Sequence, residues 1–277
     1  MKYYILVFSG LLIISVNLFF FSCNRTCDNS IDEKSDSLIM GNNEKKVKHK
    51  KYYKIPLSID LLNYIKDHNK NYNPELLNSV SNSDKYFNED KKQINFGVYV
   101  TDLGYTSIFK QNQRSIEYFN VLKRMAEDLN ITEGYGESLL KRIDRNINNS
   151  DSLKYIAEES YWDAFLGLEE KGKKKVLVNI IFGSWLESIY ISSHTFTEKD
   201  KDMLMLLVGQ SMVIENIKNY IMMEPYNEAD YSNVMEDLKQ IYLLLNRYSE
   251  NIESIGSNDY EKIKTVISNI RNKYIKN

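Results

Sequence analysis

The sequence has few of the residues that interrupt helices and few that bind metals or form disulfides. Its 277 residues include three prolines, 11 glycines, three histidines and two cysteines. Folds built from strands and turns use many prolines and glycines, so their scarcity favours a helical protein. The formal net charge of −2 provides no overall attraction to nucleic acid, and we expect no nucleic-acid partner.

Standard catalytic and metal-binding motifs are also missing from the sequence. None of His49, His68 and His194 follows a glutamate by three residues, which excludes the Glu-x-x-His pairs of di-iron helical bundles. The chain has no His-Glu-x-x-His, Walker A, Gly-x-Ser-x-Gly or Gly-x-Gly-x-x-Gly sequence. We therefore predict no metal, no cofactor and no standard catalytic constellation.

The N-terminus carries the most specific signal in the sequence. Lys2 is followed by an apolar run, residues 5–21, and then by Ser22 and Cys23. This order resembles a bacterial lipoprotein signal peptide, residues 1–22, in which a small residue precedes a cysteine that is lipidated. An uncleaved anchor, at the short limit for crossing a membrane, and an ordinary secretory signal are the alternatives.

The residues after Cys23 indicate a location and a tether. Asn24 is not the aspartate that retains many lipoproteins at the inner membrane, so we expect an outer-membrane lipoprotein that faces the periplasm or the cell surface. Residues 23–53 are polar and lack apolar periodicity, which predicts a disordered tether. Cys27 has no intrachain partner if Cys23 is acylated, and is either incidental or available for an intermolecular disulfide.

Lysines gather at the end of the tether. Six of the residues in 45–54 are lysines and none is acidic, whereas 55–277 contain 27 basic and 33 acidic residues, a net charge of −6. A solvated linker is one interpretation of this basic cluster. The other is contact with anionic lipid head groups near the anchor, worth about 1 kcal/mol for each lysine at the surface.

From Pro56 onward, apolar residues recur at helical spacing. The predicted helices cover residues 56–69, 74–80, 94–129 with a break near 111–113, 137–147, 150–171, 176–192, 203–223, 227–250 and 258–275. The polar segment 81–92 is expected to be a loop or a weak helix. We therefore expect 54–277 to form a single all-α domain, a multi-helix bundle of about eight to ten helices. Segments 94–110 and 176–193 are apolar around nearly the whole helical circumference, which is typical of two buried central helices.

The two central segments share a pattern. Each contains Phe-Gly, then an aromatic and an apolar residue, then an acid and a tyrosine. Gly97 and Gly104 are seven residues apart and therefore share a line on their helix. Because glycine in a helix interior costs about 1 kcal/mol relative to alanine, we predict close helix packing at Gly97, Gly104 and Gly183.

The same segments contain the candidate polar site, which consists of Asp102, Tyr105, Trp185, Glu187 and Tyr190. One interpretation is a cleft in which carboxylates and tyrosine hydroxyls bind a polar ligand or perform acid–base chemistry. The other is structural: a tyrosine, an arginine or a backbone group holds each carboxylate, which then fixes the helix register. When the two Phe-Gly pairs are aligned, Glu187 corresponds to Thr101 and not to Asp102. The alignment therefore does not indicate a duplicated catalytic pair.

Several short segments also resemble known sequences. Gly97-Val98-Tyr99, Asp102-Leu103, Tyr105 and Gly183-x-Trp185-Leu186-Glu187-x-Ile189-Tyr190 resemble segments of uncharacterised helical lipoproteins of Bacteroidota-type bacteria, over most of 90–195. The resemblance implies a helical fold and a cell-envelope location, and brings no activity. We expect a non-catalytic binding or scaffold domain for an envelope protein or small ligand. The alternative is an enzyme or small-ligand binder that uses Asp102 or Glu187 with nearby tyrosines.

Overall fold

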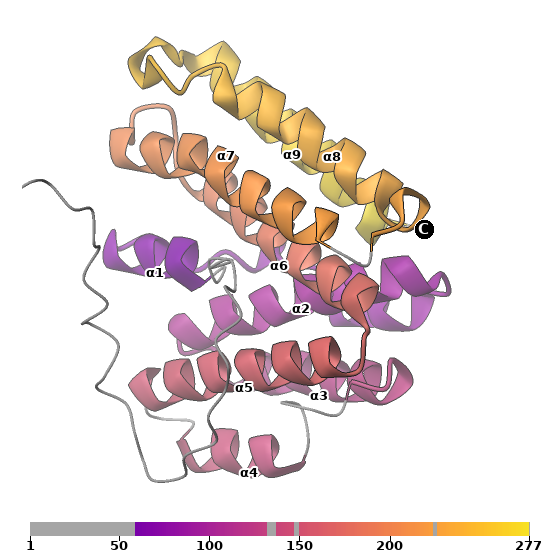
Figure 1. Cartoon of the computed structure of the whole chain (residues 1–277). Coiled ribbons are helices and arrows are strands. Elements are labelled where there is room, and N and C mark those ends of the chain that lie inside the picture. The colour runs from indigo at the N-terminus through magenta and orange to yellow at the C-terminus, as the bar shows by residue number, and fades with distance from the viewer. Residues whose placement is uncertain (1–58, 132–136, 147–149, 224–225, 277) are drawn as a thin grey trace, which may run out of the picture. The chain divides into compact units, whose positions relative to one another are not determined.

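The computed structural model describes residues 59–131, 137–146, 150–223 and 226–276, which belong to one compact unit (Figure 1). The expected signal peptide, the tether with Cys23 and Cys27, and the basic cluster at 45–54 lie outside the described residues. Within these residues the chain forms helices and no strand, and the predicted all-α bundle is confirmed.

Nine α-helices and three short 3₁₀ helices make up the described part of the chain. The α-helices are α1 (Ile59–Asp67), α2 (Glu89–Ile108), α3 (Asn112–Asp128), α4 (Glu137–Asn146), α5 (Ser150–Glu170), α6 (Lys174–Thr195), α7 (Lys201–Met222), α8 (Glu228–Asn246) and α9 (Ser257–Ile275). The 3₁₀ helices are η1 (Pro74–Leu76), η2 (Val80–Lys85) and η3 (Ile252–Ser254).

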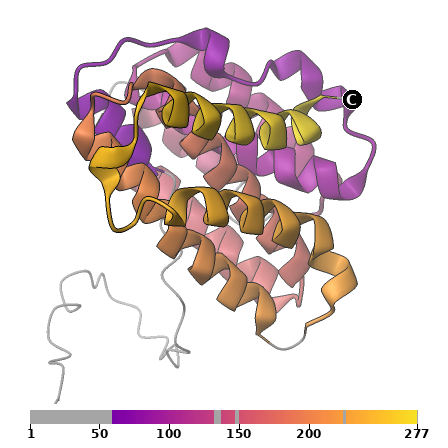
Figure 2. The same cartoon turned by 90° about the horizontal axis from the view of Figure 1, so that it is seen from above.

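Helices α2 and α6 form the centre of the bundle, as their apolar circumference predicts. They make the most extensive helix–helix contact in the described chain. Helices α1 and α5 pack against both, α3 packs against α2, and α4 packs against α5. On the other side of α6 lie α7, α8 and α9, of which α9 also touches α2 (Figures 1 and 2). Helices α1 and α9, the first and last helices of the described chain, therefore both pack against the central pair.

The backbones of α2 and α6 touch at the two Phe-Gly pairs. A Cβ atom on Gly97 would overlap the Ile180 carbonyl oxygen and lie 2.7 Å from the Ser184 nitrogen. A Cβ atom on Gly183 would overlap the Ile94 carbonyl oxygen and lie 2.8 Å from its carbon. Ile94 and Ile180 each stand three residues before a glycine, so the contact has a local twofold pattern. The repeated Phe-Gly sequence therefore packs against its own copy.

Polar pairs run along the same interface in the same order on both helices. Near the start of α2, Gln93 accepts a 2.8 Å hydrogen bond from the Asn179 amide. Further along, the Thr101 hydroxyl lies 2.9 Å from the Ser184 carbonyl oxygen. The two helices therefore run in the same direction, and their side chains stay in register beyond the glycine contact. Gly104 is half-buried, and its predicted close packing stays a prediction.

Helix α2 begins five residues earlier than predicted, within the polar segment that we expected to be a loop or a weak helix. Asn88 caps the helix by accepting a 2.9 Å bond from the Lys91 amide, and Glu89 and Asp90 occupy the first turn. Acids in the first turn stabilise a helix N-terminus. The apolar pattern missed this turn because capping and dipole interactions involve polar residues.

The connection between α1 and α2, residues 73–86, is less regular than predicted. Asn73 caps η1 as expected, but the helix predicted through Val80 ends at Leu76, and Leu77 is extended. Two short 3₁₀ helices cannot bond all their own backbone groups. The remaining groups of this connection are bonded by buried side chains of other helices.

One described helix, α6, is long and apolar enough to cross a membrane. However, 83% of its apolar window is buried inside the bundle, as is typical of the core helix of a folded domain. We therefore interpret α6 as the core of the bundle.

We predict that Gly97→Ala and Gly183→Ala each destabilise the domain, because the added methyl group would overlap backbone atoms of the other helix. The expected loss is about 1–3 kcal/mol, the usual effect of overpacking, or more. Gly209→Ala is the matched control. Gly209 also lies inside a helix, α7, but a Cβ there has no neighbour within 4 Å, so stability should rise by up to about 1 kcal/mol. Urea unfolding monitored by circular dichroism measures all three. Equal effects at the three glycines would contradict the backbone contact.

Candidate functional site

A buried ion pair joins α6 to α9. Arg271 donates to both carboxylate oxygens of Glu187, with Nε to Oε2 at 2.5 Å and Nη2 to Oε1 at 2.6 Å. The Glu187 side chain is 0% exposed and that of Arg271 is 6% exposed. The Arg271 Cζ atom lies 4.0 Å from the ring centroid of Tyr190, a cation–π contact. The guanidinium is thus held on its edge by a carboxylate and on its face by a ring.

Asp102 lies beside this ion pair and is itself fully buried. Its Oδ2 atom accepts a 3.2 Å hydrogen bond from the backbone amide of Asn78. Its Oδ1 atom has no donor within hydrogen-bonding distance among the described residues. Burial raises the pKa of the Asp102 carboxyl well above its usual range, and the charge of Glu187 raises this pKa further against the opposing effect of Arg271.

The buried polar groups bind the backbone of the 73–86 connection. Arg271 Nη2 donates to the Leu76 carbonyl oxygen at 3.0 Å. The Tyr118 hydroxyl donates to the Asn78 carbonyl oxygen at 2.9 Å, and the Tyr99 hydroxyl donates to the Ser79 carbonyl oxygen at 2.8 Å. Buried carbonyl and amide groups require such partners. The cluster therefore replaces the hydrogen bonds that a regular helix would have made.

Asn78 is the central residue of this connection. Its side-chain amide donates to the Tyr86 hydroxyl at 2.9 Å and to Asn95 Oδ1 at 3.2 Å. Asn95 in turn donates to the Tyr274 carbonyl oxygen at 3.0 Å, near the end of α9. Asn78 thus contributes its amide N–H, its carbonyl and its side chain to one network with α2, α3 and α9.

The tyrosines of the network act as neutral donors. Burial raises the pKa of Tyr99 and of Tyr118 above the usual phenol value, and the charge of Asp102 contributes to both shifts. A phenol with a raised pKa keeps its proton at neutral pH and is a poor general base. Their hydroxyls are also committed to carbonyl oxygens, so they supply hydrogen bonds to the fold and no free proton acceptor.

The structure brings together three of the five candidate site residues and separates the other two. Asp102, Glu187 and Tyr190 meet around Arg271. The Tyr105 hydroxyl instead accepts a 3.1 Å bond from the Asn73 amide. Trp185 faces α7, where its indole N–H donates to Gln210 Oε1 at 3.0 Å.

Arg271 and Asn78 are the site residues that sequence reasoning missed. Arg271 occupies a position of the buried stripe of α9, between Ile267 and Tyr274. A lone arginine on an apolar helix stripe therefore indicated a buried partner. Asn78 gave no comparable signal, because it lies in a short polar connection without periodicity.

A second polar contact lies at the end of α6. His194 Nδ1 is 2.8 Å from the Tyr190 carbonyl oxygen, and its Nε2 is 3.2 Å from the Ser268 hydroxyl. Burial lowers the pKa of this histidine. Ser268 lies inside α9, where backbone N–H groups are engaged in the helix, so this pair lacks the oxyanion donors of a hydrolase. It ties α6 to α9.

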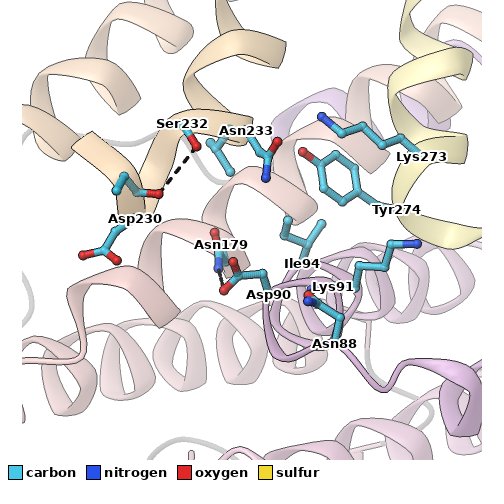
Figure 3. Close-up of a pocket in the computed structure, with 12 residues that line it drawn as sticks. Asn88, Asp90, Lys91, Ile94, Asn179, Asp230, Ser232, Asn233, Lys273 and Tyr274 are labelled. Carbon is cyan, nitrogen blue, oxygen red and sulfur yellow. Dashed lines mark hydrogen bonds between the residues drawn. The ribbon is translucent and has the colours of Figure 1, made fainter. Parts of the chain in front are cut away.

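A pocket of about 270 Å³, lined mainly by polar residues, lies between the N-terminal turns of α2, α6 and α8 and the last turn of α9 (Figure 3). Its charged groups are largely paired within the protein. Asp90 is 2.9 Å from Lys175, the Lys273 ammonium bonds Asp237, and the Lys91 ammonium bonds the Lys276 carbonyl oxygen. The pocket offers few free charges to a ligand, and neither Asp102 nor Glu187 lines it.

No group of three or more histidine, cysteine, aspartate or glutamate side chains within the described ranges is arranged to hold a metal ion. Comparisons of the chain with protein-family models, curated proteins and solved structures found no match. Function is therefore inferred from the geometry.

We predict that Arg271→Met destabilises the domain by about 3–5 kcal/mol at neutral pH, because it leaves Glu187 as an uncompensated buried carboxylate. The matched control is Arg114→Met. Arg114 pairs with Glu117 at the surface, where ion pairs contribute little, so unfolding should barely change. Chemical unfolding of both variants measures the difference, and similar small effects would show that the Glu187 pair is not structural.

Proposed function

We propose that the protein is a lipid-anchored, non-catalytic helical domain of the cell envelope that serves as a binding or scaffold module. One observation supports the non-catalytic part: Asp102 and Glu187 are fully buried and engaged with the protein's own groups. A catalytic acid or base must reach its substrate, within about 3 Å or through one water. Neither carboxyl meets that requirement in this arrangement.

The alternative, an enzyme or small-ligand binder that uses these two acids with nearby tyrosines, is less well supported. It requires the 73–86 connection to leave the bundle, with loss of the bonds from Arg271, Tyr99 and Tyr118. Each net hydrogen bond is worth about 0.5–1.5 kcal/mol. A ligand would have to replace several such bonds together, so we prefer the structural role for Asp102 and Glu187.

A surface suited to a protein partner supports the binding part of the proposal. Met205, Gly209 and Met212 lie on one exposed face of α7, at helical spacing i, i+4 and i+7. Met205 is 51% exposed and Met212 is 72% exposed. Flexible methionine side chains adapt to varied apolar partners. We propose that this face, Met205–Met212, contacts an envelope protein.

The anchor remains the sequence-based part of the proposal. Cys23 would be lipidated, the tether 23–53 would separate the helical domain from the outer membrane, and the lysines of 45–54 would approach anionic head groups. The helical domain would then face the periplasm or the cell surface. A tethered domain without chemistry of its own is suited to hold a partner near the membrane.

We predict that Cys23→Ser abolishes incorporation of labelled palmitate and changes both the processing and the membrane fractionation of the protein. Globomycin, which blocks lipoprotein signal cleavage, should lead to accumulation of the unprocessed form of the wild type. Cys27→Ser is the matched control and should behave as wild type in both assays. Unchanged labelling and fractionation of Cys23→Ser would contradict lipidation.

We also predict that a photo-crosslinking residue in place of Met212 yields a reproducible protein adduct in intact cells. The same residue in place of Lys239, an exposed position on α8, should yield none, because it lies off the α7 face. Immunoblotting of the adducts measures both. If neither position gives a reproducible adduct, or both give the same one, the α7 face is not the partner surface.

A further inference from the structure

The buried cluster has an unbalanced charge if all its members are ionised. Asp102 and Glu187 would each carry −1 and Arg271 +1, a net charge of −1. Taken as whole residues, Asp102 and Glu187 are 0% exposed and Arg271 is 5% exposed. An uncompensated charge in such an environment is strongly unfavourable, and proteins normally avoid it by neutralising the group.

The hydrogen bonds of the cluster are also incomplete in that state. Both Glu187 oxygens accept from Arg271, and Asp102 Oδ2 accepts from the Asn78 amide. Asp102 Oδ1 has no donor among the described residues, and the Glu187 carboxyl beside Asp102 is another acceptor. An ionised carboxylate only accepts hydrogen bonds, whereas a protonated one donates. One proton between the two acids therefore satisfies Oδ1 and cancels the excess charge.

We infer that Asp102 is a neutral carboxylic acid at pH 7, that it donates this proton from Oδ1 to Glu187, and that loss of the proton at alkaline pH loosens the 73–86 connection. Asp102 and Glu187 thus form a buried proton-binding site in which a single proton completes the contact between α2 and α6. Arg271 cannot serve in its place, since the guanidinium stays protonated.

Several elements surround the Asp102 carboxyl and determine its titration. Two charged groups shift its pKa, Glu187 from α6 and Arg271 from α9. The tyrosines that interact electrostatically with it are Tyr118 from α3, Tyr99 from α2, Tyr86 just before α2, and Tyr72 from the connection that follows α1. Burial raises the pKa of each of these tyrosines, so the phenols stay neutral. Glu187 and Arg271 are then the only charged groups in this set.

The sign of the pH effect follows from the direction of the shift. The pKa of Asp102 is raised in the folded protein, whereas in the unfolded chain it is about 3.9. Above about pH 4 the unfolded chain has lost this proton and the folded protein retains it. The stabilisation that this proton gives is complete below the pKa of Asp102 in the unfolded chain, and it is lost as pH rises through the pKa of Asp102 in the folded protein. Between these two pKa values, the unfolding equilibrium constant rises about tenfold for each pH unit.

Asp102→Asn tests the inference, because its carbonyl can accept from Asn78 and its NH₂ can donate to Glu187 without a titratable proton. We expect this variant to fold, and the ratio of wild-type to variant unfolding constants to increase about tenfold per unit from roughly pH 5 to pH 8. Asp128→Asn, at an exposed site paired with Lys92, should follow the wild type. A ratio for Asp102→Asn that does not change with pH would overturn the inference.

A measurement on the wild type covers the case in which Asp102→Asn does not fold. Protein labelled with ¹³C in its aspartate carboxyl groups should show, at neutral pH, an infrared carbonyl band of a protonated acid. The band should shift in D₂O and disappear as pH rises. Amide hydrogen exchange across 73–86 should accelerate over the same pH range more than the intrinsic rate does. Absence of the acid band at neutral pH would overturn the protonation.

Discussion

The contact between the backbones of α2 and α6 is the constraint on which the rest of this structure depends. At Gly97 and Gly183, carbonyl groups of one helix occupy the space of a side chain on the other. No other residue type leaves that space free. With the two axes this close and running in the same direction, the side chains just beyond the glycines must face each other. This places Asp102 beside Glu187, although both are acids.

The remaining polar contacts compensate for that placement. Arg271 neutralises one acid and bonds the Leu76 carbonyl oxygen with the same guanidinium. The Asn78 amide bonds the other acid, and tyrosine hydroxyls bond the neighbouring carbonyls of the connection. The buried charges thus hold an irregular segment in place, and the segment in turn excludes water from the charges. This mutual dependence explains why a polar cluster lies at the centre of an apolar bundle.

The sequence predicted the helices well because their apolar periodicity is local. It also predicted close packing at Gly97 and Gly183, where two helix-interior glycines had no other explanation. The candidate polar site contained both Asp102 and Glu187, but the packing that brings them together could not be derived, because alignment of the Phe-Gly pairs compares positions along helices and says nothing about lateral packing. Arg271 is 84 residues from Glu187, and no local pattern connects them. The separate positions of Tyr105 and Trp185 likewise depend on how the helices are rotated in the bundle.

The bond between Arg271 and Leu76 spans 195 positions of the chain, and this has a consequence for the order of folding. Closing so long a loop is entropically unfavourable, and contacts of this kind generally slow folding. Until α9 arrives, Glu187 has no counter-ion and the 73–86 connection lacks a ligand for one of its carbonyls. The centre of the bundle therefore closes only after the C-terminal helix is available. If the chain becomes available for folding from its N-terminus onward, its core cannot be completed until α9 is also available.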